Sequence, residues 1–237
     1  MQRVEGDQVP LASGLEGKLR FTLSGAHVAR TSVSSYYGKL ALIMLLSFFS
    51  CGAMAAQVEE RKLTLHNIHT QEDISIVYKR DGEFVPEALA KLDNFMRDWR
   101  RNVSIKMDPE LYDIIWTLQK ELGTQKPIQL ISGHRSSATN EGMRRRRGGQ
   151  ARASLHITGQ AADIQFPDIP LKQLRNSALI MERGGVGYYP NPGMPFVHVD
   201  TGRVRHWPRV PRQELAVLFP SGHSKHVPSD GRPITTG

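Results

Sequence analysis

The sequence has 237 residues and a formal net charge of +8, and 39% of its residues are hydrophobic. This length allows one sizeable domain with extensions or two small domains, and the composition is that of a folded globular protein. The positive charge predicts an anionic partner, and nucleic acid, an anionic membrane surface and the bacterial cell wall all qualify. The single cysteine, Cys51, excludes an internal disulfide and a cysteine-rich zinc site, so any metal must be held by His, Asp or Glu.

The N-terminal region has the order of an export signal. Residues 1–35 show no helical or strand periodicity, and we interpret residues 1–39 as an uncertain extension that a start codon assigned too far upstream would explain. Residues 40–56 combine a short apolar core with the A-x-A cleavage site Ala53-Met54-Ala55, which is typical of a signal peptide. The core is too short to span a bilayer, which needs about 20 residues, so we expect an exported periplasmic protein without a stable membrane span after processing. A buried core helix is the alternative, and Cys51 resembles a poor lipoprotein site, so cleavage is favoured over a lipid anchor.

Between residues 57 and 210 the pattern predicts a folded domain. It begins with a β-hairpin over 61–79, in which two runs of alternating apolar and polar residues flank a turn-like segment. A helix follows from Pro86, and a second helix opens at Asp108-Pro109 and stops at Gly123. The next elements are expected in the order strand, polar loop, strand and helix, at 128–131, 136–153, 161–166 and 171–181.

The last part of the domain is expected to be sheet. Two strands, 186–189 and 196–200, are joined by a Pro-Asn-Pro-Gly turn, and residues 211–237, rich in Pro, Ser and Gly, are expected to form a flexible C-terminal tail. Strands and helices do not alternate regularly, and the late strands follow one another through short turns. The pattern therefore predicts an α+β fold with an antiparallel sheet.

One segment carries a candidate metal site. His156 and Asp163 flank the turn at Gly159, which would let a loop residue and a strand residue converge on one ion. Imidazole nitrogen and carboxylate oxygen both suit zinc, and a catalytic zinc site needs three protein ligands and one open position. His198, on the strand 196–200, is the candidate third ligand. Spacing alone leaves a surface histidine and a turn aspartate as the alternative interpretation.

Several motifs in order resemble one family. The pattern Ser-x-His-x-x-Gly-x-Ala-x-Asp over 154–163 is preceded by Ser-Gly-His-Arg-Ser at 132–136 and followed by Phe-Val-His-Val-Asp-Thr-Gly at 196–202. From about Arg61 to Trp207 the chain resembles the D-alanyl-D-alanine metallopeptidases, of the superfamily shared with lysostaphin-type peptidases and the hedgehog signalling domain. Within them it is most similar to the murein endopeptidase K group. The resemblance implies a hedgehog/DD-peptidase-like zinc peptidase fold, with helices flanking an antiparallel sheet.

The resemblance also implies roles for individual residues. One Zn²⁺ ion would be held by His156, Asp163 and His198. Arg135 matches an arginine that binds a substrate carboxylate or carbonyl, and Ser154 matches a residue beside the metal that contacts substrate. These roles are chemically reasonable, because zinc polarises a carbonyl and a fixed guanidinium stabilises charge that develops on its oxygen.

Two further residues have open roles. Asp200 matches the His-x-Asp of the endopeptidase K group, and strand alternation puts it on the same face as His198. There it would act as the general base, or it would orient a zinc ligand from behind. His206 is a candidate for binding the substrate in the transition state, or it is a packed histidine beside Trp207.

The implied activity is zinc-dependent hydrolysis of peptide cross-links in peptidoglycan, between two diaminopimelate residues and also between D-alanine and diaminopimelate. Trimming of a terminal D-alanine by a carboxypeptidase and non-catalytic binding to the wall are the alternatives. The run Arg144–Arg147 is interpreted as solvated loop charge, or as a surface that holds anionic wall polymer. We expect no nucleic-acid partner, because no recognised binding motif accompanies the charge.

Overall fold

The structure, a computed structural model, describes residues 59–148 and 151–234. The expected extension at 1–39 and the signal-peptide region at 40–56, with Cys51, lie outside the described residues. The chain divides into two units, Met1–Ala55 and Ala56–Gly237, and every described element belongs to the second. None of the helices within the described ranges has the length and apolar character needed to cross a bilayer.

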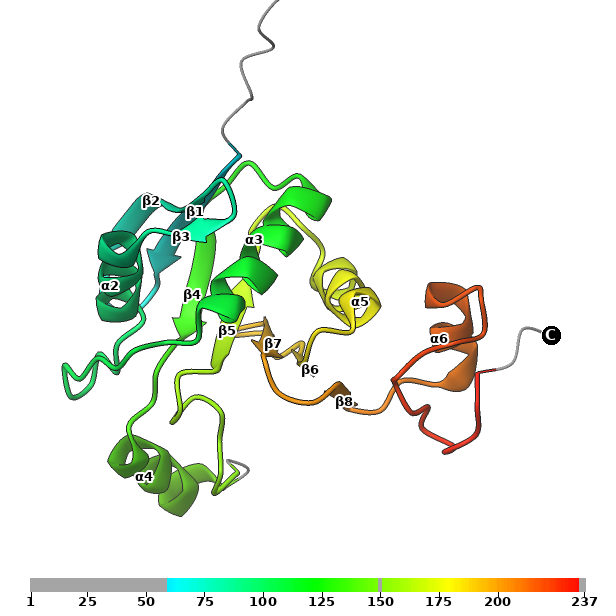
Figure 1. Cartoon of the computed structure of the whole chain (residues 1–237). Coiled ribbons are helices and arrows are strands. Elements are labelled where there is room, and N and C mark those ends of the chain that lie inside the picture. Colours follow the sequence, from blue (N-terminus) through cyan, green and yellow to red (C-terminus); the bar gives the residue numbers. More distant parts are fainter. Residues whose placement is uncertain (1–58, 149–150, 235–237) are drawn as a thin grey trace, which may run out of the picture. The chain divides into compact units, whose positions relative to one another are not determined.

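Eight strands form a single mixed sheet in the order β3-β2-β1-β4-β5-β7-β6-β8 (Figure 1). The strands are β1 (Glu60–Asn67), β2 (Asp73–Arg80), β3 (Glu83–Phe84), β4 (Ile128–Ser132), β5 (Ala161–Gln165), β6 (Gly185–Tyr189), β7 (Phe196–Asp200) and β8 (Arg205–Trp207). Most neighbours are antiparallel, but β1 pairs with β4 and β6 pairs with β8 in parallel. The α+β class is confirmed, while the sheet is mixed rather than wholly antiparallel. The crossover from β2 to β4 through two helices is long enough to return the chain parallel to β1.

The described residues also form five helices, and their bounds are α2 (Pro86–Phe95), α3 (Pro109–Leu122), α4 (Ser137–Arg147), α5 (Leu171–Met181) and α6 (Arg212–Leu218). The ends of α3 are the predicted ones. The Asp108 side chain accepts a hydrogen bond from the Glu110 N–H at the start of the helix, and Gly123 adopts a left-handed φ of 64° at its end.

One face of the sheet carries the core and the opposite face carries polar residues. Helices α3 and α5 pack against each other and against the sheet (Figure 1). Alternate strand residues, Ala162 and Ile164 in β5 and Val197 and Val199 in β7, belong to this core. Because side chains alternate along a strand, Asp163 points to the other face, where it meets His198.

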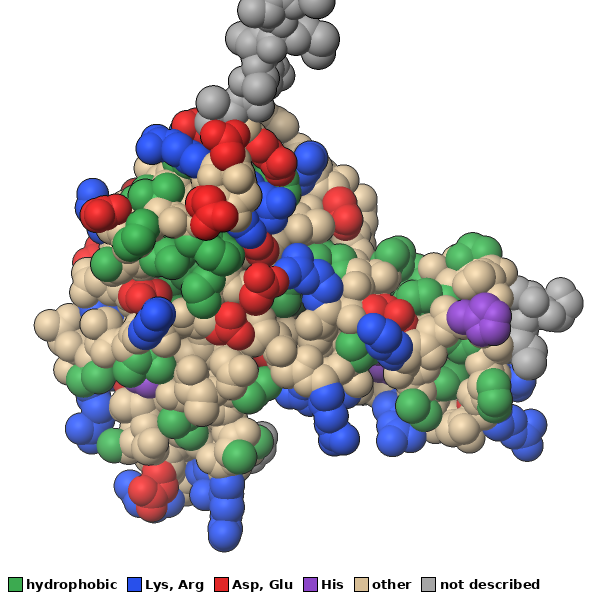
Figure 2. All heavy atoms as spheres, in the orientation of Figure 1, with side chains coloured by type: hydrophobic (Ala, Val, Ile, Leu, Met, Phe, Trp, Pro, Cys, Tyr) green, Lys and Arg blue, Asp and Glu red, His purple; other side chains and the backbone are tan. Residues whose placement is uncertain are grey.

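The expectation of a loop over 136–153 is wrong, because residues 137–147 form α4. The Ser136 hydroxyl accepts a hydrogen bond from the Thr139 N–H at the N-terminus, and Glu141 pairs with Arg145 one turn later at 2.7 Å. Arg145 and Arg146 are exposed, and Figure 2 shows Lys and Arg side chains gathered over this helix. The helix lacks an apolar stripe, so hydrophobic periodicity could not reveal it.

The chain after Pro211 also differs from the flexible tail that we expected. It contains α6, and Leu215 and Ile234 are buried in the core cluster. The His226 ring lies 3.0 Å from the carbonyl oxygen of Leu179 in α5, which ties this segment to the domain. Its one apolar run, residues 215–219, is short and is surrounded by Pro, Ser and Gly, so its burial follows from tertiary contacts.

Candidate metal centre

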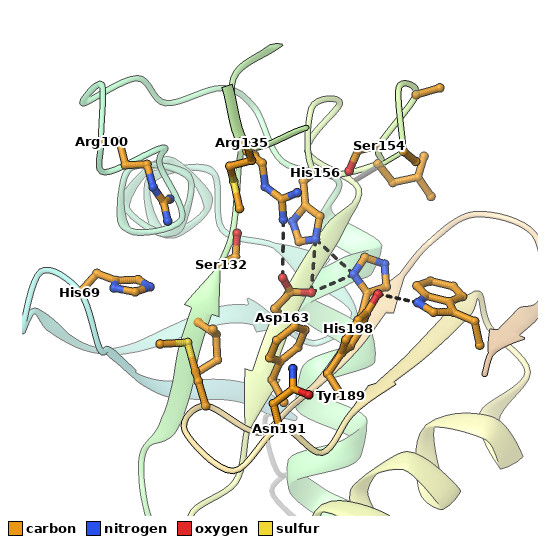
Figure 3. A pocket seen from close by; sticks show the side chains of 18 of the residues that line it. His69, Arg100, Ser132, Arg135, Ser154, His156, Asp163, Tyr189, Asn191 and His198 are labelled. Atoms are coloured by element: carbon orange, nitrogen blue, oxygen red, sulfur yellow. Dashed lines mark hydrogen bonds and ion pairs between the residues drawn. The ribbon is translucent and has the colours of Figure 1, made fainter. Parts of the chain in front are cut away.

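The three predicted ligands meet at one point (Figure 3). Asp163 in β5 is paired in register with His198 in β7, which places their side chains next to each other. Asp163 Oδ1 lies 2.9 Å from His198 Nδ1 and 3.3 Å from His156 Nε2, and the two ring nitrogens are 3.1 Å apart. All three side chains are buried.

His156 is fixed by the turn that follows β4. Its Nδ1 lies 2.7 Å from the carbonyl oxygen of Gly133, so Nδ1 carries the proton and donates it. The Arg135 N–H donates to the His156 carbonyl at 3.0 Å, which ties the two segments together. Only glycine fits at 133, because a Cβ there would lie 2.4 Å from the Met96 carbonyl oxygen. The lone pair on His156 Nε2 therefore points at the cluster.

His198 is held from behind by a carboxylate. Its Nε2 lies 3.1 Å from Asp200 Oδ2, which puts the proton on Nε2 and leaves the lone pair of Nδ1 facing Asp163. The Trp207 ring lies against it, with ring centroids 5.0 Å apart. Gly187 makes room for that indole, since a Cβ there would come within 2.7 Å of it.

The donor set and its spacing fit zinc. Two nitrogen lone pairs and a carboxylate that face one another repel unless a cation lies between them. In a tetrahedral site with zinc bonds of about 2.0–2.1 Å, donor atoms are separated by about 3.3 Å. The observed separations of 2.9, 3.1 and 3.3 Å match that spacing. One ion can thus be held by three protein atoms, leaving a fourth position toward the pocket.

Burial and the neighbouring charges act differently on the three candidate ligands. Burial lowers the pKa of His156, which keeps that ring neutral. Burial acts to raise the pKa of Asp163, but His156 and His198 lower that pKa well below its usual value, so the group is ionised. For His198, burial opposes the charged form, whereas Asp163 and Asp200 raise its pKa above the usual value. A proton on Nδ1 therefore competes with a metal ion for the same lone pair.

Asp200 does not face the pocket, and its surroundings argue against a general base. Its side chain is 0% exposed. Oδ1 accepts hydrogen bonds from the N–H groups of Gly185 at 2.8 Å and Gly202 at 2.9 Å, and Oδ2 accepts one from Arg205 at 2.8 Å. Burial raises its pKa, but His198 and Arg205 lower it far more, so the pKa lies well below the ordinary range. Of the two roles considered for this residue, the structure favours the orientation of His198.

Arg135 and Ser154 both line the pocket, which has a volume of about 760 Å³. Arg135 is buried, with one guanidinium nitrogen 3.3 Å from Asn140 Oδ1 and another 3.7 Å from Asp163 Oδ2. Its Nε is buried and has no hydrogen-bond partner among the described residues. The positively charged guanidinium lines the pocket and is suited to an oxygen acceptor on a ligand. In Figure 3 the Arg135 guanidinium lies beside His156 and Asp163.

His206 lies away from the pocket. Its Nε2 accepts a hydrogen bond from the Val210 N–H at 2.9 Å, and its Nδ1 lies 3.0 Å from His226 Nδ1. The ring is buried against the C-terminal segment and is absent from the residues that line the cavity. The expectation of a substrate contact is therefore not supported, and His206 is a packed histidine.

Sequence reasoning missed several residues of the pocket wall. His69 and Arg100 come from loops without any motif, and Tyr189 and Trp207 come from the far edge of the sheet. The Trp207 indole N–H donates to the Tyr189 hydroxyl at 2.6 Å. Nothing in the sequence pointed to His69 or Arg100.

Comparison with known proteins agrees with this geometry. A peptidase family model described as peptidoglycan L,D-endopeptidase MepK matches residues 55–207. The chain belongs to this family. It is 48% identical over 147 residues to the peptidoglycan L,D-endopeptidase MepK of Escherichia coli K12, covering 62% of this chain and 80% of that protein. It is 42% identical over 156 residues to the probable peptidoglycan L,D-endopeptidase MepK of Haemophilus influenzae, covering 65% of this chain and 83% of that one. The resemblance to the zinc peptidase superfamily, and to its endopeptidase K group, is confirmed.

Proposed function

We propose that the chain is a zinc-dependent peptidoglycan endopeptidase that is exported to the periplasm. The convergence of His156, Asp163 and His198 at the base of an open pocket carries the proposal. The relatives named as peptidoglycan L,D-endopeptidases supply the substrate class. Export is supported by the signal-like sequence of residues 40–56. Within the wall, the proposed bonds are those between two diaminopimelate residues and those between D-alanine and diaminopimelate.

The proposed chemistry is hydrolysis of an amide. His156, Asp163 and His198 would hold a zinc ion, which would supply the Lewis acidity needed to polarise the scissile carbonyl and to lower the pKa of the attacking water. Arg135 binds a carbonyl or carboxylate oxygen of the substrate through its guanidinium, whose charge stabilises the oxygen as negative charge develops. Ser154 lines the same cavity and offers a hydroxyl to the peptide.

Two groups hold the ligands in the reactive tautomers. The Gly133 carbonyl keeps the proton on Nδ1 of His156, and Asp200 keeps the proton on Nε2 of His198. Among the described residues that line the pocket, Asp163 is the only one with a carboxylate. It belongs to the ligand cluster, so in the proposed hydrolysis a proton of the attacking water passes to the leaving amine as the C–N bond breaks, without a separate carboxylate among these residues.

The proposal is tested by digesting purified peptidoglycan sacculi and identifying the released fragments by chromatography and mass spectrometry. We expect cross-linked dimers to disappear and monomers to appear, and this activity to stop with a chelator and return with zinc. His156→Ala should abolish the activity, whereas His223→Ala, at an exposed histidine outside the pocket, should not. Loss of terminal D-alanine alone would identify a carboxypeptidase. Zinc-loaded protein that changes no fragment would overturn the proposed activity.

A further inference from the structure

A second cluster of side chains forms the wall of the pocket beside the ligand cluster. His69, in the loop between β1 and β2, and Arg100, in the segment after α2, both line the cavity. Trp99 supports both of them. Its ring stacks on His69 with centroids 4.8 Å apart, and the Arg100 guanidinium carbon lies 4.3 Å from the ring centroid. In Figure 3 His69 and Arg100 lie together on one side of Asp163 and His198, and Ser154 lies on the other.

Hydrogen bonds to two charged side chains, Glu72 and Asp98, hold the loops of this wall in place. Arg97 forms two hydrogen bonds with the Glu72 carboxylate, at 2.8 and 2.9 Å, which joins the loop of His69 to the segment of Arg100. A bidentate pair of this kind fixes orientation as well as distance.

Hydrogen bonds to Asp98 join the wall to the segment that carries Arg135. The buried carboxylate of Asp98 accepts hydrogen bonds from the Ser136 hydroxyl at 2.6 Å and from the Ser136 N–H at 3.0 Å. The same carboxylate accepts a hydrogen bond from the Arg100 N–H at 3.3 Å. The position of Arg100 is thus linked directly to the turn that carries Arg135. Preorganised groups lose little entropy when a ligand binds.

The chemistry of the pocket favours an anion. Three arginines, Arg100, Arg135 and Arg205, line it, against a single carboxylate, Asp163, among its described lining residues. Arg205 is paired with the buried Asp200 carboxylate and Arg135 lies 3.7 Å from Asp163, and the described lining as a whole keeps an excess of positive charge that attracts an anion. Burial and the charge of Arg100 lower the pKa of His69, so that ring is a neutral hydrogen-bonding group at neutral pH.

We propose that Arg100 and His69, supported by Trp99, form a subsite for a free carboxylate on one of the two peptide strands of a cross-link. The inference rests on the proposed endopeptidase activity. Stem peptides carry free carboxylates at positions that the cross-link does not use, and a cross-linked substrate brings a second strand that a single stem lacks. The subsite would contact the second strand and not the reacting bond. It would therefore raise the affinity for cross-linked peptides over that for single stem peptides.

The test compares the purified zinc-loaded protein with Arg100→Gln and His69→Ala, using soluble cross-linked muropeptide dimers as the substrate. Arg101→Gln is the matched control, because it removes the same charge from an exposed neighbour that does not line the pocket. Arg100→Gln should lower kcat/KM about ten-fold through KM, with kcat little changed, as expected for a lost charge-assisted hydrogen bond. Arg101→Gln should match the wild type.

A second substrate identifies the ligand group. When the free carboxylates of the dimer are chemically amidated, the wild type should lose more kcat/KM than Arg100→Gln does, because the variant has already lost that contact. Equal losses would overturn the carboxylate assignment. An effect of Arg100→Gln that disappears only when the disaccharides are removed would overturn it in favour of a sugar subsite. If the wild type cleaves dimers and Arg100→Gln cleaves them equally well, the proposed subsite is wrong while the proposed endopeptidase activity stands. If the wild type cleaves no dimer, the proposed function fails with it.

Discussion

The role assigned to Asp200 leads to a sharp prediction for Asp200→Asn. The substitution replaces one carboxylate oxygen with an NH₂ group. If that group faces His198 Nε2, which is 3.1 Å from Asp200 Oδ2, it can only donate, so Nε2 must accept and the ring proton moves to Nδ1. The zinc-binding lone pair is then lost in most molecules. We expect zinc affinity to fall between about 10-fold and 100-fold, the usual effect of losing such an orienting partner.

The same substitution should lower stability. Asp200 is fully buried and neutralises Arg205, which is one third exposed, at 2.8 Å. Breaking a fully buried pair costs about 3–5 kcal/mol, and the partial exposure of Arg205 reduces this to about 2–3 kcal/mol. The N–H groups of Gly185 and Gly202 keep their acceptor, because the amide oxygen can replace Oδ1.

The assay measures zinc affinity by competition with a chromophoric chelator, and hydrolysis of cross-linked dimers over a range of zinc concentrations. We expect Asp200→Asn to regain most of its activity at high zinc. The control is Asp113→Asn, which removes another buried carboxylate, paired with Lys79 at 2.7 Å, outside the pocket. It should lower stability without changing zinc affinity. An Asp200→Asn enzyme with normal zinc affinity and activity reduced more than about 100-fold at saturating zinc would refute the orienting role and restore the general base.

Two more predictions concern the supports of the site. Gly187→Ala should cost about 1–3 kcal/mol in urea unfolding, because the new methyl group overlaps the Trp207 ring, whereas Gly193→Ala, with open space around it, should cost much less; equal losses would contradict the packing argument. Burial and the neighbouring His226 lower the pKa of His206 to about 4. As the pH falls, His206 is therefore protonated in the unfolded chain before it is protonated in the folded chain. The free energy of unfolding should fall by up to about 3 kcal/mol between pH about 6.5 and pH 4. His206→Gln should reduce this pH dependence and His223→Gln should leave it unchanged; a dependence that His206→Gln leaves unchanged would disprove the assignment.

The ligand cluster was the part of the site that the sequence predicted best. His156, Asp163 and His198 have side-chain types that suit zinc, and a strand with a period of two places Asp163 on a defined face. Strand pairing itself is a long-range property, so the register that sets Asp163 beside His198 came only from the structure. The alternation of side chains along the strand placed Asp200 on the same face as His198, but it did not distinguish a general base from a residue that orients His198.

The pocket wall and the peripheral helices could not be predicted in the same way. Helix α4 consists mostly of polar and charged residues and has no apolar stripe that periodicity could detect. The contact between His69 and Trp99 joins two loops that are far apart in the sequence. The ion pair between Arg97 and Glu72 holds these loops together. The burial of His206 likewise depends on a C-terminal segment whose composition resembles a loop. Tertiary contacts of this kind leave no local pattern in a single sequence.

The most direct test of the central claim is a zinc titration of metal-free protein with a purified dimer linked through two diaminopimelate residues. Hydrolysis should be absent without metal, rise in proportion to added zinc and level off at one ion per chain, and it should be abolished by Asp163→Ala at every zinc concentration. Hydrolysis by the metal-free protein would contradict the account. So would intact dimer in the presence of protein shown to hold one zinc ion per chain.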